Sequence, residues 1–365
     1  MKNLFIAVAT GQSVSNFPPI LQYAEKGDQV LWLVSKEVED SLPQVVYVLE
    51  NRGLKNAWIK VSDLYAAKDI RDAILGHDLL SGHWTSIFFI LNGGPKLTPI
   101  GLALAGEALS DRAKIVYLHG DVKTFFRLYE NLLSENVVFS TGRYERQRML
   151  DLEEILMVAG RKLEAPAKDV WCPTSQTVPK NCIDLDPVQF FLESDGDRDG
   201  ASFEKAVFCR VVNFLNQLEN KACKEVVKEV VLGAKLMQGS KSEAEFDVAI
   251  VLLNGTVLHL ECKSGKNFTV KDIQSRTLAL ERAVSRISRL YVVLPVIPEK
   301  YDEKEFEERL SVWQNRNDEI NFKCIAFTSR ENPKQISFQK KGEKVDVVPF
   351  EYELMKIFRG FLPEE

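Results

Sequence analysis

The sequence predicts an α/β protein of two domains, in which a doubly wound sheet is followed by a domain with the order α-β-β-β-α-β. The 365 residues are enough for two domains of about 100–200 residues, each with its own core. Hydrophobic residues make up 45% and charged residues 27% of the chain, as in ordinary globular proteins. Apolar runs alternate with helical patterns in the first half, and the order of elements changes after Gly200.

In the first half, β-branched and aromatic runs predict strands at residues 4–9, 29–34, 57–61, 86–91 and 114–118. Helical patterns lie between and after them, at residues 17–26, 41–52, 66–76, 98–109 and 122–133. Strands that alternate with helices at this spacing predict a parallel, Rossmann-like sheet with helices on both faces. We therefore expect a first domain over residues 1–142.

The middle of the chain predicts a helix at 143–162 and a proline-bearing connector at 166–187. We assign residues 143–199 to this connection and residues 200–365 to the second domain. The patterns there predict a helix, a strand, a hairpin, a helix and a strand, at residues 203–218, 226–232, 245–263, 271–289 and 290–295.

Composition excludes several classes of protein. The net charge is −5, so a nucleic acid would have to bind through a local basic patch. Apolar runs such as residues 248–253 are far shorter than the ~20 residues of a membrane span. The N-terminus lacks a signal-peptide pattern, and we expect a cytoplasmic protein with no membrane partner. The six cysteines include no C-x-x-C pair, which favours free buried thiols over zinc ligands.

The register of the hairpin can be predicted from the positions of its apolar residues along the two strands. Asn254-Gly255 between two alternating runs is a strong turn signal. A two-residue loop would scatter the apolar residues over both faces. A three-residue loop with Gly255 left-handed gathers them on one face, through the pairs 252/256, 250/258, 248/260 and 246/262, and burial favours this second register.

The favoured register brings polar side chains together. Asp247 then pairs with Glu261, and Lys263 follows on the same face. Paired carboxylates suit Mg²⁺ or Mn²⁺, and a lysine can stabilise charge on phosphorus or orient a water, which is phosphodiester hydrolysis chemistry. Glu204 on the preceding helix can add a third carboxylate. Charged strand faces are often merely solvated, however, and Gln274 is best interpreted as a solvated helix residue.

Residues 200–296 resemble the PD-(D/E)xK, or restriction-endonuclease-like, nucleases in their order of elements and in these residues. Phe246 stands where many members have proline. The resemblance implies an enzyme that cleaves DNA, RNA or both. It also implies catalytic roles for Asp247, Glu261, Lys263 and Glu204, and Mn²⁺ or Mg²⁺ held by Asp247, Glu261, Glu204 and the backbone carbonyl of Cys262.

Two candidate ligand loops of the first half, residues 10–16 and 92–98, follow strands at the edge where doubly wound sheets bind ligands. Glycines before a helix let backbone N–H groups approach an anion, and Lys96 adds a charge. Neither G-x-G-x-x-G nor a Walker A motif is present, which argues against dinucleotides and NTP hydrolysis. Tight turns alone would also explain the glycines. The candidate ligand residues are Thr10, Gly11, Gln12, Ser13, Asn16, Asn92, Gly93, Gly94, Pro95, Lys96 and Thr98.

Together these loops resemble those of CARF domains, with Pro95 where relatives often have threonine. A CARF-like domain before this nuclease core resembles the CARF nucleases of type III CRISPR antiviral defence. The resemblance implies allosteric activation by a cyclic oligoadenylate, with cyclic tetra-adenylate the expected ring. It further implies a homodimer in which each subunit binds half of that ring.

Two alternatives remain open. The chain could be a constitutive restriction or repair nuclease whose first domain only dimerises. It could also be a non-enzymatic, nucleotide-sensing regulator that binds DNA through a basic helix, because residues 261–290 carry seven Lys or Arg against three Asp or Glu, a local charge of +4.

Overall fold

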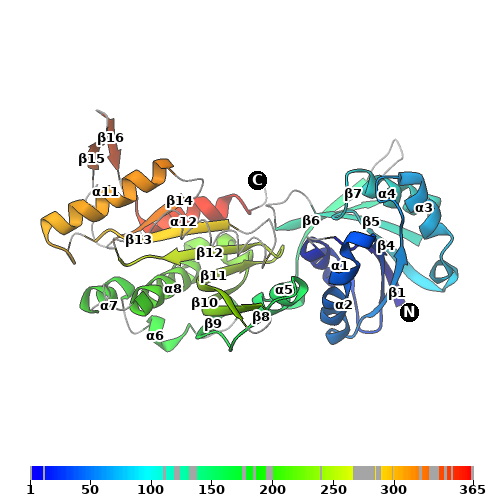
Figure 1. The fold of residues 1–365 in the computed structure, drawn as a ribbon, viewed down its shortest axis with the longest axis horizontal. Coiled ribbons are helices and arrows are strands. Elements are labelled where there is room, and N and C mark those ends of the chain that lie inside the picture. The colour runs from blue at the N-terminus through cyan, green and yellow to red at the C-terminus, as the bar shows by residue number, and fades with distance from the viewer. Residues whose placement is uncertain are drawn as a thin grey trace.

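The computed structural model describes residues 2–10, 13–109, 112–118, 124–130, 138–174, 178–183, 186–194, 200–238, 241–265, 284, 289–297, 299–319, 323–328, 337–340, 343–346 and 348–362. It is a mixed α/β structure with two large sheets, which lie side by side along the long axis of the molecule (Figure 1). The predicted fold class is confirmed.

The first sheet has seven strands in the order β3-β2-β1-β4-β5-β6-β7. Their bounds are β1 (Lys2–Val8), β2 (Gln29–Val34), β3 (Lys55–Lys60), β4 (Trp84–Ile90), β5 (Ala113–Leu118), β6 (Phe125–Glu130) and β7 (Val138–Arg143). The pairs among β1 to β5 are parallel, whereas β6 and β7 extend the sheet in antiparallel fashion. The doubly wound part of the prediction is therefore correct.

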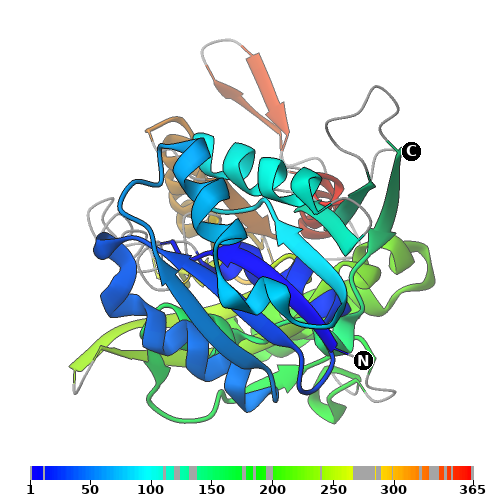
Figure 2. The same cartoon turned by 90° about the vertical axis from the view of Figure 1, so that its right-hand side faces the viewer.

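Helices cover both faces of this sheet, as Figure 2 shows. They are α1 (Phe17–Tyr23), α2 (Leu42–Asn51), α3 (Ala67–Leu75) and α4 (Leu97–Ala108), with the short 3-10 helix η1 (Ser13–Asn16) before α1. Alternate residues of β1 face opposite layers, as strand geometry requires. Phe5 packs in the core of α1 and α2, and Leu4 packs in the core of α3 and α4.

Two helix predictions in this region are wrong in part or in whole. Residues 122–133 do not form a helix where they are described, because Phe125–Glu130 form β6 between β5 and β7. The aromatic pair at its start suits a strand. The helix predicted over 143–162 is limited to α5 (Leu152–Val158), which begins at a capping box formed by Asp151 and Glu154.

The second sheet has the order β14-β13-β12-β11-β10-β8, and β9 also pairs with β10. Its strands are β8 (Lys162–Leu163), β9 (Asp169–Trp171), β10 (Val227–Gln238), β11 (Lys241–Leu252), β12 (Val257–Cys262), β13 (Arg289–Pro295) and β14 (Lys323–Phe327). The segment predicted as a connector thus contributes strand β9 to this sheet. A separate ribbon consists of β15 (Ser337–Lys340) and β16 (Glu343–Asp346).

In its described residues the second half has the helices α6 (Lys180–Ile183), α7 (Pro187–Glu193), α8 (Gly200–Asn216), α9 (Lys221–Glu225), α11 (Glu303–Glu319) and α12 (Phe350–Arg359). Helices α8 and α12 share one core with alternate residues of the second sheet. The predicted helix at 271–289, with Gln274 and most of its basic face, lies outside the described residues.

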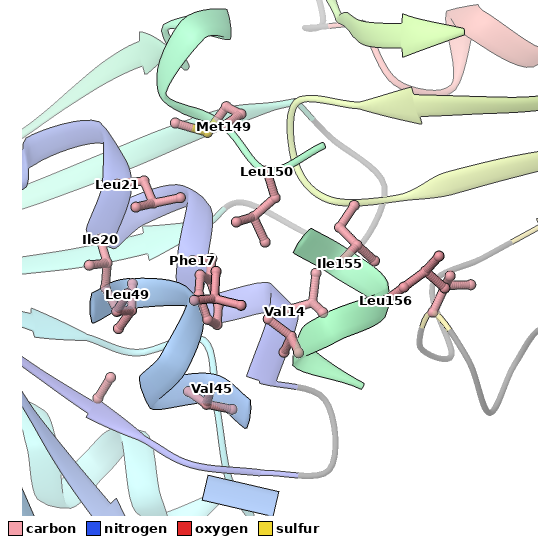
Figure 3. Packing of buried hydrophobic residues seen from close by; sticks show 14 of the residues in the cluster. Val14, Phe17, Ile20, Leu21, Val45, Leu49, Met149, Leu150, Ile155 and Leu156 are labelled. Atoms are coloured by element: carbon pink, nitrogen blue, oxygen red, sulfur yellow. The ribbon is translucent and has the colours of Figure 1, made fainter. Parts of the chain in front are cut away.

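The two halves also share a core. One apolar cluster contains Val14 of η1, Phe17 of α1, Ile155 of α5 and Val251 of β11. Figure 3 shows Val14 and Phe17 close to α5, next to the yellow-green turn between β11 and β12. The hairpin of the second sheet is therefore packed against the first domain at its turn.

The cysteine prediction needs one correction. Cys182 and Cys209 form a disulfide that joins α6 to α8, with their Cα atoms 4.8 Å apart. Cys223, Cys262 and Cys324 are buried thiols that take no part in a disulfide, as predicted. The 27-residue separation of the bonded pair gives no sign in the sequence that α6 packs on α8.

Candidate active site

The turn of the β11–β12 hairpin has the predicted three-residue form. Gly255 adopts a φ of +83°, and its N–H donates to the carbonyl of Leu252 at 2.9 Å. The N–H of Leu252 donates to the carbonyl of Thr256 at 2.8 Å. The predicted pairs 248/260 and 250/258 are both present, so the register is confirmed.

One part of the predicted apolar face is wrong. Val248 packs in the core of α8, but Phe246 packs in the core shared with the first domain. Strand β11 therefore changes face at Asp247, whereas Leu260 and Cys262 of β12 both remain in the core of α8. The neighbouring strand β10 changes face at the same level, because the register pairs 232/248 and 234/246 flank Gly233, whose φ is +64°. The pairing stays one to one on both sides of Gly233, so both strands change face without a change of register.

Asp247 and Glu261 come together just beyond the last paired residues of the hairpin. Their carboxylate oxygens lie within 4.8 Å of each other and of a nitrogen of His259. Asp247 is 5% exposed and Glu261 is fully buried. Because the strands part here, Asp247 Oδ2 accepts a hydrogen bond from the backbone N–H of Cys262 at 2.7 Å. That bond fixes one oxygen and leaves Oδ1 for another partner.

Lys263 and Glu204 complete the predicted group. Lys263 Nζ forms an ion pair with Glu261 Oε1, and its side chain is 20% exposed. Glu204 extends from α8, with its side chain 17% exposed. Burial, followed by the charges of Glu261 and Glu204, raises the pKa of Asp247 to about 8. The carboxylates therefore repel one another, and a bound cation would relieve that repulsion.

This donor set fits a hard divalent cation. Carboxylate oxygens from two neighbouring strands, with a third carboxylate close by, are the ligands that Mg²⁺ and Mn²⁺ prefer. Asp247, Glu261 and Glu204 could hold such an ion, and the predicted carbonyl of Cys262 lies between Glu261 and Lys263 on the same strand.

His259 also lies at this site, which the sequence patterns did not predict. Its Nε2 accepts the backbone N–H of Asp247 at 3.2 Å and lies 3.6 Å from Glu261 Oε2, while its ring packs edge-on against Phe246. This hydrogen bond places the ring proton on Nδ1. The alternation of side chains along a strand could have indicated it, since alternate residues of an extended segment, here His259, Glu261 and Lys263, share one face.

The two loops of the first domain lie together at the edge of the first sheet. Ser15 Oγ donates to the carbonyl of Asn92 at 2.9 Å and joins them. Gly93 is closely packed, because a Cβ there would lie 3.1 Å from Asn16 Nδ2, and Gly94 has a φ of +84°. Lys96 is exposed at the start of α4, where it could meet an anion.

The side chains of two predicted ligand residues, Asn16 and Thr98, bind backbone carbonyls inside the protein. Asn16 Nδ2 donates to the carbonyl of Val8 at 2.8 Å, and Thr98 Oγ1 donates to the carbonyl of Leu64 at 2.8 Å. Both side chains are buried, so they shape the loops from within. Gly11 and Gln12 lie outside the described residues, as does the side chain of Ser13. Thr10 and Pro95 are partly buried beside these loops.

Solved structures share this fold. Protein VC1899 from Vibrio cholerae is 11% identical, with a TM-score of 0.61 over 89% of this chain and 94% of that one. Can2 from Sulfobacillus thermosulfidooxidans, in complex with cyclic tetra-adenylate, is 14% identical, with a TM-score of 0.59 over 97% and 96%. A type III CRISPR defence DNA nuclease activated by cyclic oligoadenylate is 19% identical, with a TM-score of 0.58; the match covers 98% of this chain and 52% of the nuclease.

No protein-family model matches the sequence, and no curated protein matches it. None of the helices in the described part of the chain has the length and apolar composition that crossing a bilayer requires. The identities to the solved structures are low, so the similarity concerns the fold. The chain therefore shares its fold with Can2 and with a nuclease of type III CRISPR defence, as the resemblance to CARF nucleases predicted.

Proposed function

We propose that this chain is a metal-dependent nuclease that hydrolyses phosphodiester bonds in DNA, RNA or both, and that a cyclic oligoadenylate bound to its first domain activates it. The observation that carries the proposal is the convergence of Asp247 and Glu261, both buried, with Lys263 paired to Glu261. The fold shared with a cyclic-oligoadenylate-activated nuclease supports the same function. We place the protein in type III CRISPR antiviral defence, acting in the cytoplasm.

In this mechanism Asp247, Glu261 and Glu204 hold Mg²⁺ or Mn²⁺, which when bound polarises the scissile phosphate and lowers the pKa of a water nucleophile. Lys263 is partly exposed while its ammonium group contacts Glu261. It can therefore face the charge that develops on the phosphate oxygens. His259 accepts the N–H of Asp247 and so keeps β11 aligned with β12 where their backbone pairing has ended.

A physical connection between the two candidate sites supports the allosteric part of the proposal. Val14 lies inside the first candidate ligand loop, and a Cβ placed on Gly255 would lie 2.7 Å from Val14 Cγ1. Gly255 is the turn of the hairpin that carries both Asp247 and Glu261. A cyclic oligoadenylate that moves this loop would therefore act directly on the hairpin. If the ligand binds one arrangement of the loop more tightly than another, it would shift the protein toward the arrangement it prefers.

We also propose that the active form is a homodimer that shares one cyclic tetra-adenylate across its twofold axis. Titration of the ring should then saturate at one ring per two chains. Saturation at one ring per chain would contradict this assembly, and sedimentation velocity with and without the ring would report the mass independently.

The proposed activity is tested with the full chain, Mn²⁺, and plasmid DNA or single-stranded RNA, with and without cyclic tetra-adenylate. Cleavage that requires both metal and ring supports the proposal. Equal cleavage without the ring indicates a constitutive nuclease. Absence of cleavage together with metal-independent binding to specific DNA sequences indicates a regulator.

Variants separate the two sites. Glu261→Ala and Lys263→Ala should each lower cleavage by about 100-fold or more without changing the affinity for the ring, whereas Lys235→Ala, an exposed lysine of the same sheet, should cleave normally.

Lys96→Ala should raise the ring concentration needed for half-maximal cleavage by about ten-fold. Lys55→Ala, on the exposed opposite edge of the first sheet, is its control.

A further inference from the structure

Lys168 lies next to the candidate active site, in a segment that the sequence presents only as a connector. It directly precedes β9, and its backbone N–H donates to the carbonyl of Leu232 in β10 at 3.0 Å. The next residue, Asp169, is the register partner of Leu232. The backbone of Lys168 is therefore fixed to the second sheet one residue before Gly233.

The side chain of Lys168 crosses the sheet over Gly233. A Cβ at Gly233 would lie 2.5 Å from Lys168 Cδ, closer than packed carbon atoms come. The left-handed φ of +64° at Gly233 also disfavours any other residue. Gly233 lies opposite Asp247, because the pairs 232/248 and 234/246 enclose the two. The glycine thus leaves space for the lysine stem beside the position where Asp247 enters the site.

The ammonium group of Lys168 reaches carboxylates from two other elements. Its Nζ lies 3.5 Å from Glu204 Oε2 on α8 and 3.6 Å from Glu245 Oε1 on β11. Glu204 is in turn close enough to Asp247 for its charge to raise the pKa of Asp247. Glu204 therefore lies between a cation on one side and the paired carboxylates on the other.

We propose that Lys168 is a positioning residue of the nuclease site, whose ammonium group holds the Glu204 carboxylate beside Asp247 and Glu261, where it can act as a metal ligand. The inference rests on the proposed function, since it assumes that these carboxylates bind a divalent ion. Without Lys168, the repulsion from Asp247 and Glu261 would turn Glu204 away from the site.

Two effects of the lysine charge on metal binding oppose each other. A cation near the site repels Mn²⁺, but the Lys168 side chain is 49% exposed, so water screens that repulsion. The contact with Glu204 is direct, at 3.5 Å, and the Glu204 side chain is only 17% exposed, so this attraction is screened less. We therefore expect the loss of Lys168 to weaken metal binding, as the loss of residues that orient metal ligands generally does.

The test measures Mn²⁺ binding to the full chain by electron paramagnetic resonance, without substrate. Lys168→Met should weaken Mn²⁺ binding by about ten-fold, and Lys168→Arg should restore most of the affinity. In the Glu204→Gln background, Lys168→Met should have little further effect, because its role runs through Glu204. Lys162→Met, an exposed lysine of β8, serves as the matched control and should bind Mn²⁺ normally.

Cleavage assays add a second measurement. The Mn²⁺ concentration for half-maximal cleavage should rise in Lys168→Met by the same factor as the binding constant. Unchanged or tighter Mn²⁺ binding in Lys168→Met would overturn the inference, as would an equal loss in Lys162→Met or a full additional loss on top of Glu204→Gln. A wild-type chain that neither binds Mn²⁺ nor cleaves would instead overturn the proposed function.

Discussion

The contact between the hairpin turn and the first domain predicts a large and specific effect of Gly255→Ala. The alanine would have to adopt a φ of +83°, which costs about 1–2 kcal/mol for a residue with a side chain. Its methyl group would also lie 2.7 Å from Val14 Cγ1, and overpacking of this kind costs about 1–3 kcal/mol. We expect the substitution to lower the free energy of unfolding by about 2–5 kcal/mol.

A double-mutant cycle with Val14→Ala separates the two causes. Val14 is 3% exposed, so its truncation alone should cost about 1–3 kcal/mol through lost burial and a small cavity. In the double variant the clash is gone and the new methyl group fills part of the cavity. The combined loss should therefore fall short of the sum by about 1–3 kcal/mol.

Urea denaturation of the four proteins, followed by circular dichroism, gives the coupling energy. Additivity within about 0.5 kcal/mol would refute the contact and, with it, the direct connection between the candidate ligand loop and the hairpin. The same proteins also test the connection in function. Val14→Ala should reduce the stimulation of cleavage by the ring while leaving cleavage without the ring unchanged.

Three further predictions concern stability. Burial raises the pKa of Glu229 to about 7. Between about pH 4.5 and 7 the folded protein therefore retains a proton that the unfolded chain has released, and its stability falls as the pH rises. Glu229→Gln should match the stability of the wild type near pH 4.5 and exceed it by up to roughly 3 kcal/mol at pH 8, and parallel pH profiles of urea denaturation would contradict this. Glu351→Ala removes both carboxylate hydrogen bonds of the buried Arg210 guanidinium, at 2.7 and 2.8 Å. By the same measurement it should lower the free energy of unfolding by about 2–4 kcal/mol, more than Arg210→Met, which leaves no buried charge. Equal losses in the two variants would argue against the ion pair. Cys182→Ser opens the disulfide and should lower stability by about 2–4 kcal/mol under non-reducing conditions. The difference should shrink when both proteins are fully reduced, to the cost of a serine hydroxyl at this buried position.

The hairpin could be predicted from the sequence because its signals are local. Asn254-Gly255 selects the turn, and alternation on both sides fixes which residues pair. Asp247 and Glu261 then meet without further information. The same reasoning failed for Phe246, because the change of face at Asp247 accompanies a left-handed Gly233 in another strand, and no pattern within the hairpin reports it.

Features that depend on pairing between distant segments could not be predicted. Phe125–Glu130 becomes a strand because β5 and β7 lie on either side of it, a context that periodicity does not contain. Lys168 reaches the site only because β9 adds to β10. The disulfide between Cys182 and Cys209 likewise requires α6 to pack against α8.

Asp247 and Glu261 lie at the end of the hairpin opposite its turn, so a rigid strand can transmit a movement of the turn to them. Glu261 is six positions beyond Gly255, which at about 3.3 Å per residue is roughly 20 Å of extended strand. Strand β12 is paired on both sides, with β11 and with β13, so it resists bending, and a displacement of the turn by Val14 would tilt it as a unit. Glu204 lies on α8, which is fixed to α12 through Arg210 and Glu351. A tilt would therefore change the spacing between Glu204 and the hairpin carboxylates, on which binding of the proposed cation depends.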